Sequence, residues 1–129
     1  MNTHESYVSL ETARLLKEAG FDWECSHWYS LDGSQWLTDR ETNNLSPENK
    51  KRFIHCPSLA VCQRWLRESK GIAVNVYSCL IPETGYKWYL RCVDMKQRDV
   101  WYKYMYKSYE EALETGIKKV LEIILDEGE

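Results

Sequence analysis

The sequence predicts an α+β fold, an antiparallel sheet of three or more strands with helices on one face. Two segments with clear helix-end signals flank three segments with strand-like alternation, so residues 57–125 are expected to fold as an α-β-β-β-α core. Helices packed on one face of the sheet would bury the apolar sides of this element order. The 129 residues are expected to form a single domain, with a helix and hairpin appendage at 1–52 and the core at 53–129.

The first elements are a short helix and a β-hairpin. Ser9 is a favourable helix N-cap, and Gly20 suits the left-handed position after a helix, which predicts a helix over 10–19. An Asp-Gly dipeptide then separates two apolar stretches, 27–31 and 35–38. Asp-Gly favours the positive φ angles of a β-hairpin turn, so these stretches are expected to pair as a hairpin.

The next segment is polar and leads into the core. Residues 39–52 contain Pro47 and few apolar side chains, so we expect an exposed loop. Pro57 is expected to open the second helix, because its missing N–H donor costs nothing in the first turn. After Lys70-Gly71 ends that helix, residues 72–81 alternate apolar and polar side chains and predict the first core strand.

The core continues with two strands and a long helix. Residues 86–93 and 100–107 are expected to be the second and third strands. A capping box formed by Ser108 and Glu111 predicts the last helix at 109–125. Gly116 inside this helix costs about 1 kcal/mol relative to alanine, which indicates either a close approach between the helix and the sheet or slack that the helix tolerates.

The outer face of the predicted sheet is the main candidate site. With Trp88, Leu90 and Cys92 facing inward, and the tyrosines of the third strand facing inward as well, aromatic and basic side chains gather on the other face. These side chains are Tyr77, Lys87, Tyr89, Arg91, Trp101 and Lys103. Three interpretations remain open: the N-terminal hairpin covers this face with Trp28 and Trp36, the face mediates self-association, or it binds a ligand.

A small anionic aromatic ligand, such as a nucleotide, would suit an accessible face of this kind. The rings of Tyr77, Tyr89 and Trp101 could stack on a base, at about 1–3 kcal/mol per base. Arg91 could meet a phosphate in a two-pronged geometry, while the two lysines act as point charges. The net charge of −3 and the isoelectric point of about 5.7 disfavour long nucleic acids, which require clustered cations.

Catalytic and metal-binding signals are sparse. Cys25, His27, His55 and Cys56 offer thiols and imidazoles, the ligand types of a zinc site, but their spacing matches no familiar finger. A metal site and scattered core residues remain the two alternatives, and a small Cys/His enzyme is a third. We expect no cofactor, no metal and no catalytic activity.

Composition also predicts the compartment. The five cysteines are odd in number, the first seven residues are polar, and no apolar run approaches the roughly 20 residues of a membrane helix. These features predict a cytoplasmic protein with reduced thiols and no membrane partner.

Two partial resemblances concern the core. The element order over 57–125 resembles the double-stranded-RNA-binding domain, whose last helix begins with a basic cluster. Here Tyr109, Glu110, Glu111 and Glu114 occupy those positions, so the RNA activity is not expected to carry over. The stretch YKSYEEALETGIKKVLEIIL, with the strands before it, also resembles HicB-type antitoxins, in which a capped Glu-Glu-Ala-Leu helix follows a small sheet.

A third resemblance spans most of the chain. The stretches VSLETARLLKEAGFDWEC, PSLAVCQRWLRESKGI and YEEALETGIKKVLEIIL are similar to small proteins encoded by phages and prophages of gut bacteria. That resemblance implies an accessory role in the bacterial host cell, such as blocking or sequestering a component of host defence. We therefore expect a non-catalytic binding protein that acts on a protein partner or on itself, or that binds a small nucleotide, through the sheet face.

Overall fold

The structure is a computed structural model, and it describes residues 6–83, 85–95 and 98–127. The side chains of Ile81, Tyr86, residues 99–105 and Glu127 lie outside the described part as well. The chain divides into two compact units, Met1–Ser58 and Leu59–Glu129.

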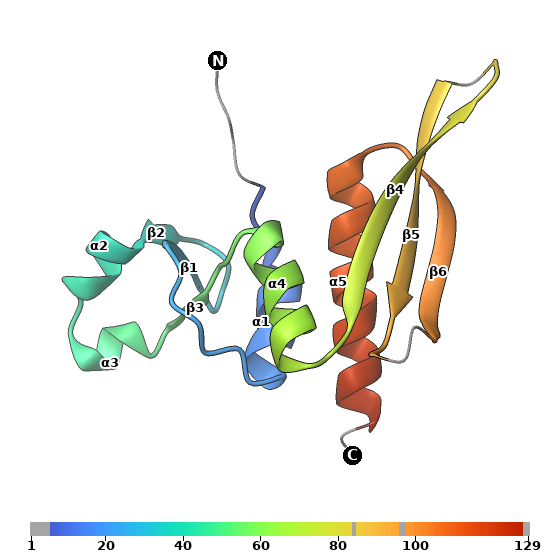
Figure 1. Ribbon diagram of the computed structural model, residues 1–129. Helices are drawn as coiled ribbons and strands as arrows, with labels where there is room; N and C mark the ends of the chain where they lie inside the picture. The colour runs from blue at the N-terminus through green and yellow to red at the C-terminus, as the bar shows by residue number, and fades with distance from the viewer. Residues whose placement is uncertain (1–5, 84, 96–97, 128–129) are drawn as a thin grey trace. The chain divides into compact units, whose positions relative to one another are not determined.

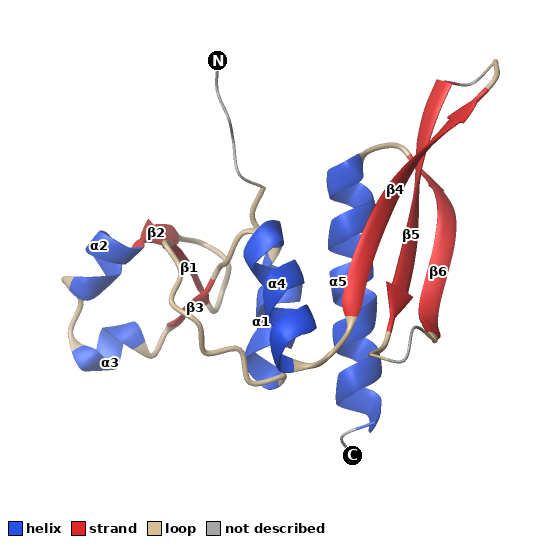
Figure 2. Ribbon diagram, in the orientation of Figure 1, coloured by secondary structure: helices blue, strands red, loops and turns tan. Residues whose placement is uncertain are grey.

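Among its described residues, the first unit combines a three-stranded antiparallel sheet with one longer and two short helices, which Figure 2 colours red and blue. The strand order is β2-β1-β3, and β1 pairs with both neighbours, so that Tyr29 lies opposite Trp36 on one side and Ile54 on the other. The hairpin predicted around the Asp-Gly turn is therefore confirmed. The elements are α1 (Leu10–Glu18), β1 (His27–Ser30), β2 (Trp36–Thr38), α2 (Asp39–Asn43), α3 (Pro47–Lys50) and β3 (Phe53–His55).

Helix α1 begins and ends where the sequence signals predicted. The Ser9 hydroxyl accepts a hydrogen bond from the Thr12 backbone N–H at 3.2 Å, and this bond satisfies one of the unpaired donors of the first turn. Gly20 follows the helix with φ of 93°, a conformation that glycine adopts without a steric penalty. Ala13 and Leu16 on the buried side are each 1% exposed, and α1 packs against β3.

The loop predicted for residues 39–52 is wrong, because two short helices occupy most of it. Thr38 and Glu41 form a reciprocal capping box that begins α2, a local signal that the polar composition concealed. Ser46 caps α3, with Pro47 in its first turn. The side chains of this segment remain mostly exposed, as expected, and Thr42 is a buried exception.

Strand β3 was not predicted from the sequence. It has three residues and pairs with β1 along its length, from Trp28 opposite His55 to Ser30 opposite Phe53. A strand this short offers too few residues for a period-two pattern to be seen. The helix expected to open at Pro57 instead begins at Leu59.

The second unit is the predicted α-β-β-β-α core, and it confirms the α+β class. Strands β4, β5 and β6 form an antiparallel sheet in that order, and the long helix α5 lies along one face of it (Figure 1). Helix α4 packs against α5 and β4. The elements are α4 (Leu59–Ser69), β4 (Ala73–Ile81), β5 (Gly85–Val93), β6 (Asp99–Tyr106) and α5 (Tyr109–Glu127).

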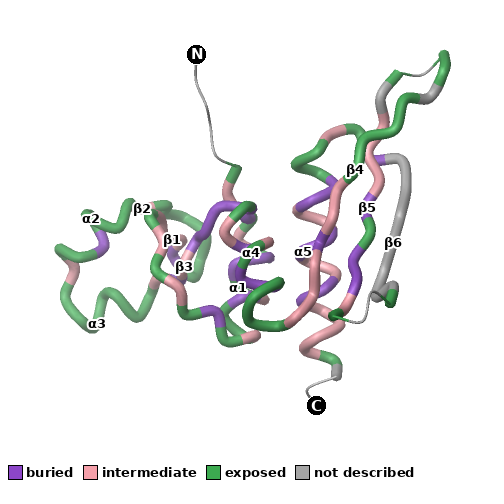
Figure 3. The backbone as a smooth tube through the Cα atoms, in the orientation of Figure 1, coloured by how far each residue is buried: buried purple, intermediate pink, exposed green. Residues whose placement is uncertain are grey.

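The core of the second unit lies between α5 and the inner face of the sheet (Figure 3). Val74, Leu90 and Cys92 of the sheet are at most 1% exposed, and α5 contributes a buried stripe at helical spacing. This stripe consists of Ala112, Leu113, Ile117, Val120 and Leu121. None of the described helices combines the length and apolar character needed to cross a membrane.

Gly116 marks the close approach of helix and sheet that the sequence indicated. A Cβ atom at this position would lie 2.6 Å from Leu90 Cδ1 and 2.9 Å from Val74 Cγ1, inside van der Waals contact. The glycine therefore lets the backbone of α5 approach β4 and β5 closely enough to bury both side chains.

Candidate functional site

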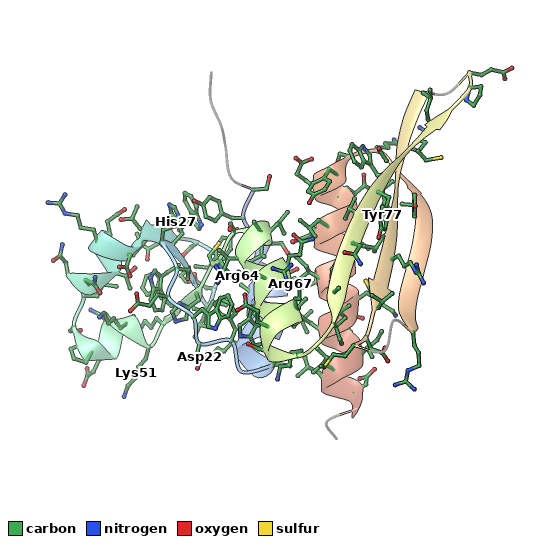
Figure 4. All side chains as sticks on the ribbon, viewed as in Figure 1. Asp22, His27, Lys51, Arg64, Arg67 and Tyr77 are labelled. Carbon is green, nitrogen blue, oxygen red and sulfur yellow. The ribbon has the colours of Figure 1, made fainter. Side chains whose placement is uncertain are left out.

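Two tyrosines form the centre of the candidate site on the outer face of β4 and β5. Tyr77 and Tyr89 lie directly opposite each other in the antiparallel pairing, and their rings stack with centroids 4.9 Å apart and planes 20° apart. Tyr77 is 41% exposed, and Figure 4 shows it midway along β4. Tyr89 is half-buried beside it, so the pair presents chiefly the ring and hydroxyl of Tyr77 to a partner.

Two cations flank this pair along β5. Arg91 is exposed and lies opposite Asn75, whereas Lys87 is half-buried and lies opposite Cys79. Side chains two residues apart on a strand share a face, so Lys87, Tyr89 and Arg91 emerge on the same side of the sheet. The structure therefore brings together four of the six residues that the sequence singled out.

The other two residues, Trp101 and Lys103, do not follow the predicted alternation in the backbone pairing. Trp101 is paired with Cys92 and Lys103 with Leu90, two buried positions, whereas Tyr102 is paired with Arg91. A register shift between Trp88 and Leu90 changes the phase, and a shift of one residue moves a strand's residues to the opposite face. The side chains of Trp101 and Lys103 lie outside the described part, so their role in the site stays a prediction.

The tryptophans of the first unit have contacts within that unit. The Trp36 ring stacks on His27 with centroids 4.1 Å apart, and its Nε1 donates to Cys56 Sγ at 3.3 Å. Trp28 donates from Nε1 to Asp39 Oδ1 at 3.2 Å and packs against the ring of His55. The interpretation that the N-terminal hairpin covers the sheet face stays a prediction.

The Cys/His set of the first unit gathers around the strands β1 and β3. Cys25 Sγ lies 3.0 Å from His55 Nδ1, while His27 Nδ1 lies 2.9 Å from Ser26 Oγ. Cys56 is fully buried and donates to the Val8 carbonyl at 3.7 Å. Among the side chains that the structure describes, no group of three or more His, Cys, Asp or Glu residues is arranged to hold a metal ion.

The Cys25–His55 contact is a functional possibility that the sequence could not define. The residues are 30 positions apart, and they meet because the unpredicted strand β3 pairs with β1. Burial raises the pKa of the Cys25 thiol from its ordinary value of 9.0 to about 11, and burial also lowers the pKa of His55. Both groups are therefore neutral at pH 7, which is the opposite of an activated thiolate–imidazolium pair.

His55 also lines a cavity of about 270 Å³ within the first unit. Helix α1 and strand β3 supply its aliphatic wall, and Phe21, Trp28 and Phe53 supply aromatic rings. Lys17 completes the lining. No pattern of residue types in the sequence indicated this cavity, because its lining comes from four separated segments.

Comparisons with protein-family models, with curated proteins and with solved structures find no match to this chain. The resemblances to phage-encoded proteins, to RNA-binding domains and to HicB-type antitoxins therefore stay predictions. Function is therefore inferred from the geometry of the sheet face of β4 and β5 and of the cavity in the first unit.

Proposed function

We propose that this chain is a non-catalytic binding protein that holds a protein partner on the outer face of β4 and β5. The observation that carries the proposal is the stacked pair of exposed Tyr77 and half-buried Tyr89, with Arg91 beside it on the same face. Tyrosine and arginine are, with tryptophan, the residue types enriched among those that dominate binding energy at protein interfaces. A rigid ring pair also loses little conformational entropy when it is covered.

The charges on this face favour a partner surface with acidic groups around an apolar centre. Arg91 and Lys87 place positive charge on both sides of Tyr89, although the chain as a whole carries a net charge of −3. Complementary charges at the rim of an interface raise the association rate and select against cationic partners. The resemblance to phage-encoded proteins is a prediction from the sequence, and on that prediction we propose a cytoplasmic host-defence protein as the partner.

The state of the Cys25–His55 pair supports a non-catalytic role. Reactive cysteines have a pKa lowered to about 3.5–7.5 by nearby positive charge or a helix N-terminus. Burial instead raises the pKa of Cys25 to about 11, so little thiolate is present at neutral pH. Nucleophilic chemistry at this pair would need an activating group beyond those seen around it.

Site-specific photo-crosslinking in a bacterial host tests the proposal. A benzophenone amino acid replaces Tyr77 on the proposed face or, as the control, Leu80, which is 63% exposed and three residues further along the same strand. Because residues three apart on a strand point to opposite faces, the control samples the other side. We expect a protein adduct from position 77 that is weak from position 80 and is reduced by Arg91→Ala.

The mass of the adduct separates the two kinds of protein partner. A heterologous adduct identifies a host protein, whereas an adduct of twice the chain mass identifies self-association through the same face. Equal adduct yields from positions 77 and 80, or yields unaffected by Arg91→Ala, would show that the sheet face is not the binding surface.

A further inference from the structure

The cavity of the first unit lies outside the proposed function and has the features of a small-molecule site. Its volume of about 270 Å³ is close to the lower end of the range of roughly 300–1,000 Å³ seen for ligand pockets. Ala13 and Leu16 of α1 and Ile54 of β3 are at most 2% exposed and line it. An aliphatic wall of this kind favours a ligand with an apolar framework of one or two rings.

Aromatic rings at different inclinations form another part of the wall. The ring centroids of Trp28 and His55 lie 4.0 Å apart, and the two ring planes are inclined by 32°. The ring centroids of Phe21 and His55 lie 6.0 Å apart, with an interplanar angle of 68°. Phe53 lines the same cavity from β3. A planar ligand can therefore stack on one ring while a second ring meets its edge, the two arrangements that aromatic pairs prefer.

The polar lining is cationic or neutral. Lys17 is exposed in the last turn of α1, where its ammonium group can reach a ligand at the cavity rim. His55 is held in place by the contact of its Nδ1 with Cys25 Sγ, so its Nε2 is the ring nitrogen that a ligand can engage. This combination recognises one carboxylate group at the end of an apolar ring.

Nearby carboxylates restrict the charge of the ligand. Asp22 and Asp39 act electrostatically on His55, so the cavity is less positive than Lys17 alone would make it. A carboxylate with one negative charge meets half the repulsion that a phosphate with two charges meets from these aspartates, and it can pair with Lys17. The cavity therefore favours a ligand with one negative charge over one with two.

We propose that this cavity binds a small planar aromatic carboxylate, with its ring among Phe21, Trp28 and Phe53 and its carboxylate at Lys17. The lining residues all belong to the first unit, so the proposal is independent of the binding function assigned to β4 and β5.

The experiment uses the full chain labelled with 5-fluorotryptophan and follows the ¹⁹F resonance of Trp28, identified by its loss in Trp28→Phe. Three probes of the same ring size are titrated: indole-3-carboxylate, neutral indole and cationic tryptamine. We expect indole-3-carboxylate to shift the Trp28 resonance saturably, with indole binding more weakly and tryptamine most weakly. No saturable shift up to millimolar probe, or a shift at other tryptophans alone, would overturn the proposal.

Two substitutions test the assigned roles. Lys17→Met is expected to weaken indole-3-carboxylate by about fivefold, as for a solvent-exposed ion pair, and to leave indole within about twofold. Lys51→Met removes an exposed lysine of the same unit that does not line the cavity, and it should leave both probes unchanged (Figure 4). Equal weakening by both substitutions would mean that attraction is non-specific and the site is wrong.

A cavity-filling variant gives an independent result. Ala13→Leu places extra apolar volume against the cavity and should abolish binding of all three probes. Circular dichroism first establishes that this variant is folded, and if it is not, the comparison of Lys17→Met with Lys51→Met decides the proposal. Unchanged binding to a folded Ala13→Leu protein would place the ligand elsewhere.

Discussion

At the scale of single residues, the surroundings of each cysteine decide its chemistry. The described cysteines are free thiols, with Cys79 exposed, Cys25 half-buried, and Cys56, Cys62 and Cys92 fully buried. Burial raises the pKa of Cys25 to about 11 and that of Cys92 to about 12, because the low-dielectric interior disfavours a thiolate. The exposed thiol and the buried thiols should therefore differ greatly in reactivity.

A brief alkylation of the native protein should reveal this order. At pH 8 with iodoacetamide, we expect the exposed Cys79 to react first and Cys25 to react much more slowly, since raising the pKa of Cys25 from 9.0 to about 11 lowers its thiolate fraction about a hundredfold. Cys56, Cys62 and Cys92 should react after unfolding in urea. Peptide mass mapping at several times gives the rates, and a Cys25 rate equal to that of Cys79 would contradict the burial of this thiol.

At the scale of elements, the sequence predicted those whose signals are local and repeated. The capping residues Ser9 and Ser108 lie at the starts of α1 and α5, and the alternation over 72–81 corresponds to β4. The short helices α2 and α3 were missed, because their caps stand within a polar segment that lacks an apolar stripe.

The candidate site was predicted in part for a related reason. Strands β4 and β5 pair without interruption from Ala73 opposite Val93 to Ile81 opposite Gly85, so alternation alone placed Tyr77, Tyr89 and Arg91 on one face. In β6 a register shift breaks this regularity, and alternation in the sequence cannot show where such a shift occurs. The cavity in the first unit depends on contacts between distant segments, which no local pattern encodes.

The packing of α5 on the sheet predicts the effect of adding one methyl group. Gly116→Ala should gain about 1 kcal/mol in helix propensity but lose more through collision with Leu90 and Val74, for a net loss of about 1–2 kcal/mol in the free energy of unfolding. Urea unfolding followed by circular dichroism measures this difference.

The neighbouring residue on α5 provides the control for this substitution. Thr115→Ala removes a hydroxyl that donates to the Glu111 carbonyl at 2.8 Å in an exposed position, so a change within about 0.5 kcal/mol is expected. If Gly116→Ala stabilised the protein instead, the close approach of helix and sheet would not be a constraint on this position.

At the scale of the whole molecule, the chain contains two units with separate sheets. The first unit has the β2-β1-β3 sheet with α1, and the second has the β4-β5-β6 sheet with α5. The proposed protein-binding face belongs to the second unit, and the proposed carboxylate cavity belongs to the first. This separation makes the two functions testable one at a time.

The second unit should fold without the first. Its apolar stripe on α5 is buried against Val74 and Leu90 of its own sheet, and domains of about 55–65 residues, shorter than Leu59–Glu129, often fold alone. A fragment of residues 59–129 is expected to unfold cooperatively in urea and to give the Tyr77 crosslink described above, while it no longer binds indole-3-carboxylate. The fragment removes the cavity but keeps the sheet face, so it also separates the two proposed sites. A fragment without cooperative unfolding would show that the sheet and α5 do not supply a sufficient core. The Tyr77 crosslink would then be lost as well, because the stacking of Tyr77 on Tyr89 requires the pairing of β4 with β5.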